Sequence, residues 1–171
     1  MSFAFASERL ANVRQDAQRL RDGARDHDIQ LEALVVAGEG GHAEAAVSRA
    51  ADPNAVLVAD DYGDVRELLA HVLENAGFVV RTAANGLEAF LAAYEMRPAV
   101  IVMDLSMPIL DGINATRLIK AIELTRDARV IAYTGNPSFD ASTTRTLFAA
   151  VLQKPATPEV VLAAVREVAA L

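Results

Sequence analysis

The fold is decided by the stretch Val100-Ile101-Val102-Met103-Asp104-Leu105-Ser106-Met107-Pro108. It opens with four apolar residues in a row, three of them β-branched, which predict a strand buried on both faces. The run ends at the carboxylate of Asp104, and Asp111-Gly112 then predicts a loop before a helical pattern resumes at Ile113. Asp104 is therefore expected at the carboxyl end of a central parallel strand, the edge at which open α/β sheets bind their ligands.

Further strands and helices alternate along the second part of the chain. Apolar runs predict strands at 56–58, 78–82, 99–103, 129–133 and 150–153. Apolar residues at helical spacing predict helices at 65–76, 87–96, 113–124, 139–148 and 157–170. Serine and threonine weaken the fourth of these helices, which we expect to be short, irregular or mobile. The alternation indicates a flavodoxin-like α/β fold, in which five helices flank a five-stranded parallel sheet of order 2-1-3-4-5.

Residues 1–53 do not follow this pattern and are predicted to form an N-terminal helical extension. We place the domain boundary at Asp52-Pro53-Asn54, with a second domain at 54–171. Two interpretations of the extension stay open: its first helix packs on the rest of the protein, or it is a dimerisation or partner-binding helix. The apolar stripe of that helix recurs every three or four residues, at Leu10, Val13, Ala17, Leu20 and Ala24.

The composition disfavours several classes of protein. The net charge is −7 and the isoelectric point is near 4.9, which argues against DNA binding because phosphate contacts need basic patches. The chain has no cysteine, which removes disulfides, thiol catalysis and cysteine-ligated zinc. There is no apolar run of membrane-spanning length and no secretory signal, so we expect a cytoplasmic protein without a membrane partner.

Polar side chains follow four of the predicted strands. Asp60 and Asp61 come after the first strand, Asp104 after the third, Thr134 after the fourth and Lys154 after the fifth. In the order 2-1-3-4-5 these four strands lie side by side, so all five side chains are expected in one crevice. Three carboxylates so close together repel one another, and a hard divalent ion with oxygen ligands, such as Mg²⁺, resolves that repulsion.

This set of groups is suited to phosphoryl transfer. A carboxylate can act as the nucleophile and form an aspartyl phosphate. Such a transfer needs positioning and charge neutralisation more than acid–base chemistry. Lys154 supplies a positive charge for one phosphoryl oxygen, Thr134 supplies a hydroxyl donor for a second, and the ion takes the third.

The motifs around these side chains resemble the receiver domain of two-component response regulators. The resemblance covers roughly Asn54 to Leu171. It implies that Asp104 accepts a phosphoryl group from a histidine kinase or a histidine phosphotransfer protein in a Mg²⁺-dependent reaction. The motifs that carry it, in order, are Val58-Ala59-Asp60-Asp61, Met103-Asp104-Leu105-Ser106-Met107-Pro108-Ile109-Leu110-Asp111-Gly112, Thr134-Gly135 and Lys154-Pro155.

The resemblance also implies which residues hold the metal ion. Asp61 and Asp104 would bind Mg²⁺ directly through their carboxylates, together with the backbone carbonyl of Ser106. Asp60 would act largely through water.

Further roles in the same site are implied for residues near the phosphoryl group. Thr134 and Lys154 would contact the phosphoryl group and report its arrival. Ser106 and Asn136 stand at the positions that tune phosphoryl lifetime in the family. The Lys154-Pro155 peptide bond would be cis, as in the family, which the sequence permits without requiring.

The chain departs from the family pattern at Val151, where the family usually has a tyrosine or phenylalanine that turns inward as the threonine moves. Tyr133, beside Thr134, is a candidate for this switch aromatic, and the sequence leaves open whether it can replace the missing ring.

Three hypotheses for the function follow. In the first, the protein is a single-domain response regulator, because the chain ends with the last receiver helix, and it signals by contact with a downstream protein or by phosphorelay. In the second, suggested by Val151 and the weak fourth helix, it is an interaction scaffold that works without phosphorylation. In the third, it is a hydrolase with an aspartyl-phosphate intermediate. Such phosphatases carry a second aspartate two residues after the nucleophile, where this chain has Ser106, so we expect slow self-hydrolysis at most and no enzymatic turnover.

Overall fold

The computed structural model of the protein describes residues 52–136, 139 and 146–170. The chain divides into two units, 1–49 and 50–171, and the described residues belong to the second. Strands and helices alternate along it, as the apolar periodicity predicts. The elements are β1 (Asp52–Ala59), α3 (Gly63–Asn75), β2 (Val79–Ala83), α4 (Gly86–Met96), β3 (Pro98–Asp104), α5 (Gly112–Ala121), β4 (Arg129–Thr134), β5 (Ala150–Gln153) and α6 (Pro158–Ala169).

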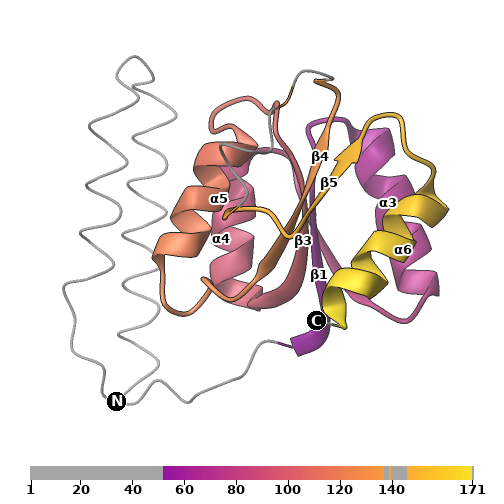
Figure 1. The fold of residues 1–171 in the computed structure, drawn as a ribbon, viewed down its shortest axis with the longest axis horizontal. Coiled ribbons are helices and arrows are strands. Elements are labelled where there is room, and N and C mark those ends of the chain that lie inside the picture. The colour runs from indigo at the N-terminus through magenta and orange to yellow at the C-terminus, as the bar shows by residue number, and fades with distance from the viewer. Residues whose placement is uncertain (1–51, 137–138, 140–145, 171) are drawn as a thin grey trace. The chain divides into compact units, whose positions relative to one another are not determined.

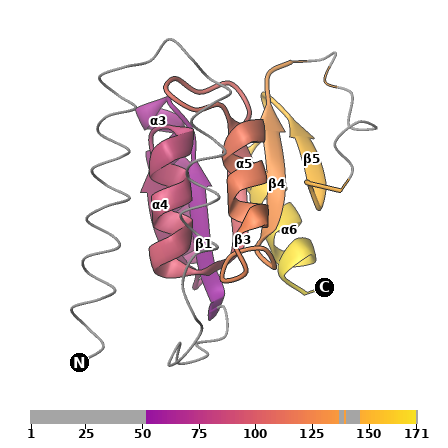
Figure 2. The same cartoon turned by 90° about the vertical axis from the view of Figure 1, so that its left-hand side faces the viewer.

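The described strands form one parallel sheet in the order β2-β1-β3-β4-β5, which confirms the predicted topology. In its register, Val102 of β3 lies between Val58 of β1 and Ile131 of β4. Helices α3 and α6 cover one face of the sheet and α4 and α5 the other (Figure 1). Turned by 90°, the molecule shows α4 and α5 side by side (Figure 2).

The core lies on both faces of the three central strands. Alternate strand residues, such as Val58 and Val102, face α3 and α6 and pack with Val161 and Val165 of α6. The residues between them, such as Ile101, are also fully buried. A strand buried on both faces has no room for a polar side chain until it ends, which is why the first reactive groups appear at the strand ends.

Helix α5 ends at Ala121, three residues before the predicted end at Leu124. The Thr125 hydroxyl donates to the Ile119 carbonyl at 2.7 Å, so a side chain takes the place of a helical backbone donor. Lys120 Nζ donates to the carbonyls of Arg126 at 2.9 Å and Ala128 at 2.7 Å. These bonds turn the chain back toward β4, although the apolar pattern of the sequence continues.

Other boundaries also differ from the predictions. Strand β1 begins at Asp52, so the predicted linker Asp52-Pro53-Asn54 is the exposed start of a strand. Leu68 of α3 is 52% exposed, whereas its apolar neighbours Leu69 and Leu73 are buried. The α6 prediction is close: Thr157 is the N-cap and Pro158 the first helical residue.

The described residues contain four helices, whereas five were predicted around the sheet. Most of the predicted fourth helix, 139–148, lies outside the described residues, but Thr146 and Leu147, near its end, form a turn. The predictions for residues 1–51, including the dimerisation or partner-binding helix, also lie outside them. None of the described helices is long and apolar enough to cross a membrane.

Candidate phosphoacceptor site

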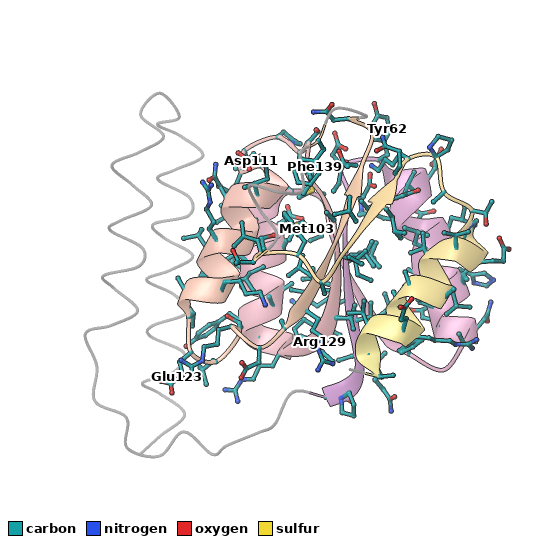
Figure 3. All side chains as sticks on the ribbon, viewed as in Figure 1. Tyr62, Met103, Asp111, Glu123, Arg129 and Phe139 are labelled. Carbon is teal, nitrogen blue, oxygen red and sulfur yellow. The ribbon has the colours of Figure 1, made fainter. Side chains whose placement is uncertain are left out.

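The predicted site residues lie at the carboxyl edge of the sheet. Asp60 directly follows β1, Asp104 and Thr134 are the last residues of β3 and β4, and Lys154 directly follows β5. Figure 3 marks this end of the molecule by Tyr62, Asp111 and Phe139, while Arg129, at the start of β4, lies at the opposite end. The convergence follows from the parallel strand order, which brings these four strand ends together.

Three carboxylates form a compact acidic cluster at this edge. One oxygen from each of Asp60, Asp61 and Asp104 lies within 4.8 Å of the others. The first and the last are 1% and 3% exposed, whereas Asp61 is exposed to solvent. Two buried carboxylates at such a distance need a cation between them, because burial weakens the screening of their repulsion.

Lys154 supplies one such cation. Its Nζ atom donates to Asp60 Oδ2 at 2.7 Å and to Asp104 Oδ2 at 2.8 Å, so that one ammonium group bridges the two buried acids. Desolvation acts to lower the pKa of Lys154, but the hydrogen bonds and negative charges of the two aspartates outweigh it and raise the pKa above its ordinary value. Lys154 is therefore an ammonium ion at neutral pH.

The backbone holds the remaining oxygen of each buried acid. The amide of Tyr62 donates to Asp60 Oδ1 at 3.0 Å, and the amide of Ser106 donates to Asp104 Oδ1 at 3.0 Å. Arg66 of α3 donates from Nη1 to the backbone carbonyl of Asp60 at 2.6 Å. Both carboxylates are thus held in a fixed orientation from two sides. The sequence reasoning had missed Arg66, whose only signal was its position on α3, five residues after Asp61.

Thr134 and Asn136 flank the cluster on the β4 side. The Thr134 side chain is buried, and its Oγ1 accepts a hydrogen bond from the Asn136 amide at 3.1 Å. The Thr134 carbonyl accepts from the Lys154 amide at 2.7 Å, which ties the end of β4 to the lysine. Thr134 lies one residue beyond Tyr133, the register partner of Asp104.

The loop after Asp104 is held by main-chain contacts to glycines. The amide of Gly112 donates to the Leu105 carbonyl at 3.2 Å, and that of Gly86 donates to the Leu110 carbonyl at 3.0 Å. A Cβ atom on Gly112 would lie 2.0 Å from the Asp104 carbonyl oxygen, and one on Gly86 would lie 2.3 Å from that of Leu110. The sequence marks Gly112 only as part of a loop and does not reveal either close approach, which only a residue without a Cβ atom permits.

Tyr133 and Val151 lie on opposite faces of the sheet. Tyr133 belongs to the core cluster under α3 and α6 and is the register partner of Leu152. Val151 pairs with Ala132 and is 40% exposed. The Tyr133 ring therefore does not occupy the space that an aromatic side chain at position 151 would fill. The Lys154-Pro155 peptide bond is cis, as the resemblance implied.

The donor set at the acidic cluster fits a magnesium ion. Mg²⁺ prefers hard oxygen ligands and is held in proteins by one or two carboxylates, with water or phosphate oxygens completing its shell. The three aspartates provide such oxygens within 4.8 Å of one another, and one of them, Asp61, is open to solvent. The backbone carbonyl of Ser106 belongs to the residue whose amide already binds Asp104.

A comparison with known protein families identifies the family of the chain. The sequence profile of the response regulator receiver domain matches residues 56–166. The chain belongs to this family. The match spans all the strand ends that build the cluster, from Asp60 to Lys154, so the receiver is the part of the chain that the structure describes.

The relatives of this chain match it over only part of their own length. The transcriptional regulatory protein PrrA of Mycobacterium tuberculosis is 40% identical over 85 residues, which cover 50% of this chain and 36% of PrrA. A protein-glutamate methylesterase/protein-glutamine glutaminase of Hahella chejuensis is 45% identical over 65 residues, covering 37% of this chain and 19% of that protein. The chain thus spans well under half the length of these relatives.

Solved receiver structures superpose on the described fold. The chemotaxis protein CheY4 of Vibrio cholerae is 28% identical with a TM-score of 0.62, covering 67% of this chain and 97% of CheY4. The receiver domain of the sensor histidine kinase PA1611 from Pseudomonas aeruginosa is 26% identical with a TM-score of 0.63, covering 69% of this chain and 98% of that one. The PA1611 structure has a magnesium ion coordinated in its active site cleft.

Proposed function

We propose that Asp104 accepts a phosphoryl group from a histidine kinase or a histidine phosphotransfer protein, and that the modified receiver signals by contact with another protein or by relay. The observation that carries this proposal is the bridge from Lys154 to Asp60 and Asp104 inside a cluster of three carboxylates. The proposal concerns residues 52–170 and is independent of what other domains the protein carries.

In the proposed reaction, a carboxylate oxygen of Asp104 attacks the phosphorus of a phosphohistidine. A new O–P bond forms, the P–N bond breaks, and the histidine nitrogen leaves with its electron pair and takes up a proton. Asp61, Asp104 and the Ser106 carbonyl would hold Mg²⁺, and Asp60 would reach it through water. The ion supplies charge neutralisation to the transferring group when it is bound.

Lys154 and Thr134 carry the protein's own part of this reaction. In the structure the Lys154 ammonium forms ion pairs with two carboxylates, those of Asp60 and Asp104. When a phosphoryl group with negatively charged oxygens is attached to Asp104, the same ammonium is proposed to bind one of them. The Thr134 hydroxyl, at the end of the adjacent strand, is proposed to donate to a second. Ser106 and Asn136 flank these groups and are proposed to tune how long the aspartyl phosphate lasts.

The test is phosphorylation of the purified full chain by acetyl phosphate with Mg²⁺, followed by intact-mass measurement. We expect one added phosphoryl group on the wild type and none on Asp104→Ala. Asp111→Ser is a matched control in the same loop, because serine can replace the N-cap that Asp111 forms with the Asn114 amide at 2.8 Å. An adduct that persists in Asp104→Ala would place the acceptor elsewhere.

A second candidate is a scaffold that binds its partner without phosphorylation. It is favoured by Val151, which leaves an aliphatic, 40% exposed side chain where the family has its switch aromatic. The same experiment separates the two, because a wild type that gains no phosphoryl group supports the scaffold. A third candidate function is that of a phosphatase. It is disfavoured because the second aspartate of such enzymes is replaced by Ser106 in this chain, and steady release of phosphate from an external monoester would support it.

A further inference from the structure

The Tyr133 ring lies beneath the lysine of the site. Lys154 Nζ is 4.8 Å from the centroid of this ring, within the range of a cation–π contact. Tyr133 as a whole residue is 5% exposed, and the Lys154 side chain is 21% exposed. The ammonium group is therefore held on three sides, by the carboxylates of Asp60 and Asp104 and by an aromatic face from the neighbouring strand.

The ring cannot leave this position without opening the core. Tyr133 is part of the cluster formed with Val102 of β3 and with Val161 and Val165 of α6, and Ala156 packs against the same cluster. Its hydroxyl also lies 3.5 Å from the Ala156 carbonyl oxygen, at the outer limit of a hydrogen bond. Turning the ring out to solvent would leave a cavity beside buried valines. Tyr133 is thus a fixed wall of the site.

We propose that Tyr133 is a positioning residue that holds the Lys154 ammonium at the acidic cluster, before and after phosphoryl transfer, rather than a ring that rotates as a switch. This inference rests on the function proposed above. A lysine side chain has a flexible stem of four methylene groups with many rotamers. Its ammonium group is strongly hydrated, which favours conformations that point into solvent. The negative face of the ring keeps the charge near the sheet edge, while the carboxylates fix its direction.

A leucine at position 133 would keep an apolar wall but remove the aromatic face. A phenylalanine would keep the face and remove only the long hydroxyl contact. The two substitutions therefore separate the aromatic contact with Lys154 from the packing contribution and from the hydroxyl. Tyr94 of α4 supplies a matched control, because Tyr94→Leu removes a partly buried tyrosine from a different element.

Nuclear magnetic resonance of the unphosphorylated chain, labelled with ¹³C-lysine, tests the contact directly. The sequence has only two lysines, Lys120 and Lys154. We expect the ε-methylene protons of Lys154 to be shifted upfield by the ring in the wild type and in Tyr133→Phe, and to lose that shift in Tyr133→Leu. Lys120, bound to the Arg126 and Ala128 carbonyls, is the internal reference. An unshifted Lys154 signal in the wild type would overturn the inference.

The rate of phosphorylation by acetyl phosphate tests the role. Tyr133→Leu should be slower than wild type by about two- to thirty-fold, which corresponds to the usual range of a cation–π contact, and Tyr133→Phe should stay within about twofold. Tyr94→Leu should match the wild type. Tyr133→Phe as slow as Tyr133→Leu would assign the effect to the hydroxyl, and Tyr133→Leu as fast as wild type would exclude positioning. Either result overturns the inference.

Failure of the proposed function and failure of the Tyr133 inference can be told apart, because the two experiments test different claims. If the wild type takes up no phosphoryl group, the proposed function fails, and the lysine spectra alone decide whether the ring holds the ammonium. If Tyr133→Leu does not fold, the wild-type spectrum and Tyr133→Phe still give a result that supports or overturns the contact.

Discussion

Replacing Gly112 by alanine should destabilise the receiver next to Asp104, the proposed phosphoacceptor. Gly112 is the first residue of α5, and an added Cβ atom would lie 2.0 Å from the Asp104 carbonyl oxygen and 2.9 Å from the Leu105 Cα. Cβ contacts below 3.0 Å are essentially never seen, and the atoms in the way are backbone. To go from 2.0 Å to at least 3.0 Å, the end of β3 and the start of α5 have to separate by 1.0 Å or more.

The size of the effect follows from two opposing contributions. Alanine is a better helix former than glycine by up to about 1 kcal/mol, which favours the variant. Overpacking against a rigid backbone costs about 1–3 kcal/mol and occasionally more. We expect a net loss of about 2 kcal/mol. A displacement of about 1 Å at the nucleophile should also slow phosphorylation by about a hundredfold.

Gly63→Ala is the matched control, because Gly63 is the first residue of α3 and follows the acidic residues of the same site. A Cβ atom there would meet only the end of the Arg66 side chain, at 3.8 Å. This variant should be neutral or more stable by up to about 1 kcal/mol, since only helix propensity and chain entropy act.

Urea unfolding followed by circular dichroism measures both variants against the wild type. With a slope of about 2 kcal/mol per molar, the Gly112→Ala midpoint should fall by about 1 M, while the Gly63→Ala midpoint should stay or rise. Phosphorylation by acetyl phosphate gives the rate. A Gly112→Ala chain at least as stable as Gly63→Ala, or one that is phosphorylated at the wild-type rate, would refute the close approach at Asp104.

Three further predictions concern the loop, the lysine and the metal. Ile109 has a φ of 69°, a left-handed conformation that costs a β-branched residue about 1–2 kcal/mol, so Ile109→Asn should raise the urea midpoint; a lower midpoint would contradict it. Lys154→Met should cost about 3 kcal/mol at neutral pH, since it leaves two buried acids without their cation. The pKa of Lys154 is raised in the folded protein, so the stability difference between wild type and Lys154→Met is fully present below pH 10.5. It should disappear as the pH rises beyond 10.5 through the pKa of Lys154 in the folded protein, and unfolding measured as a function of pH will test this. Saturating Mg²⁺, at about a hundred times its dissociation constant, should stabilise the wild type by about 2.7 kcal/mol in thermal melts; an equal gain in Asp61→Asn would show that the ion binds elsewhere.

The position of the site could be predicted from sequence because it depends mainly on the backbone. The apolar run before Asp104 requires a strand buried on both faces, and a parallel order places the ends of β1, β3, β4 and β5 at one edge. Asp60 and Lys154 are far apart in the chain, yet the alternation of strands and helices alone predicts that they meet. The structure confirms that meeting at 2.7 Å.

The contacts within the site could not be predicted, because they depend on side-chain conformations and on register. The face on which Tyr133 lies follows from its pairing with Leu152 and from its place in the core cluster, neither of which the sequence shows. The early end of α5 depends on the bonds of Lys120 and Thr125 to carbonyls six residues away along the chain, which an apolar pattern does not reveal. The two glycines at the starts of α4 and α5 looked like ordinary turn residues until their distance to neighbouring backbone was known.

The loop that follows Asp104 is fastened by two hydrogen bonds between main-chain amide and carbonyl groups, from Gly112 to Leu105 and from Gly86 to Leu110. Fastening of this kind does not depend on which side chains the loop carries between those points. The side chains of residues such as Ser106 and Pro108 can therefore be exchanged without breaking these two main-chain hydrogen bonds. An engineer could use that freedom to reset the duration of the signal or the choice of partner while keeping Asp104 and the backbone bonds around it.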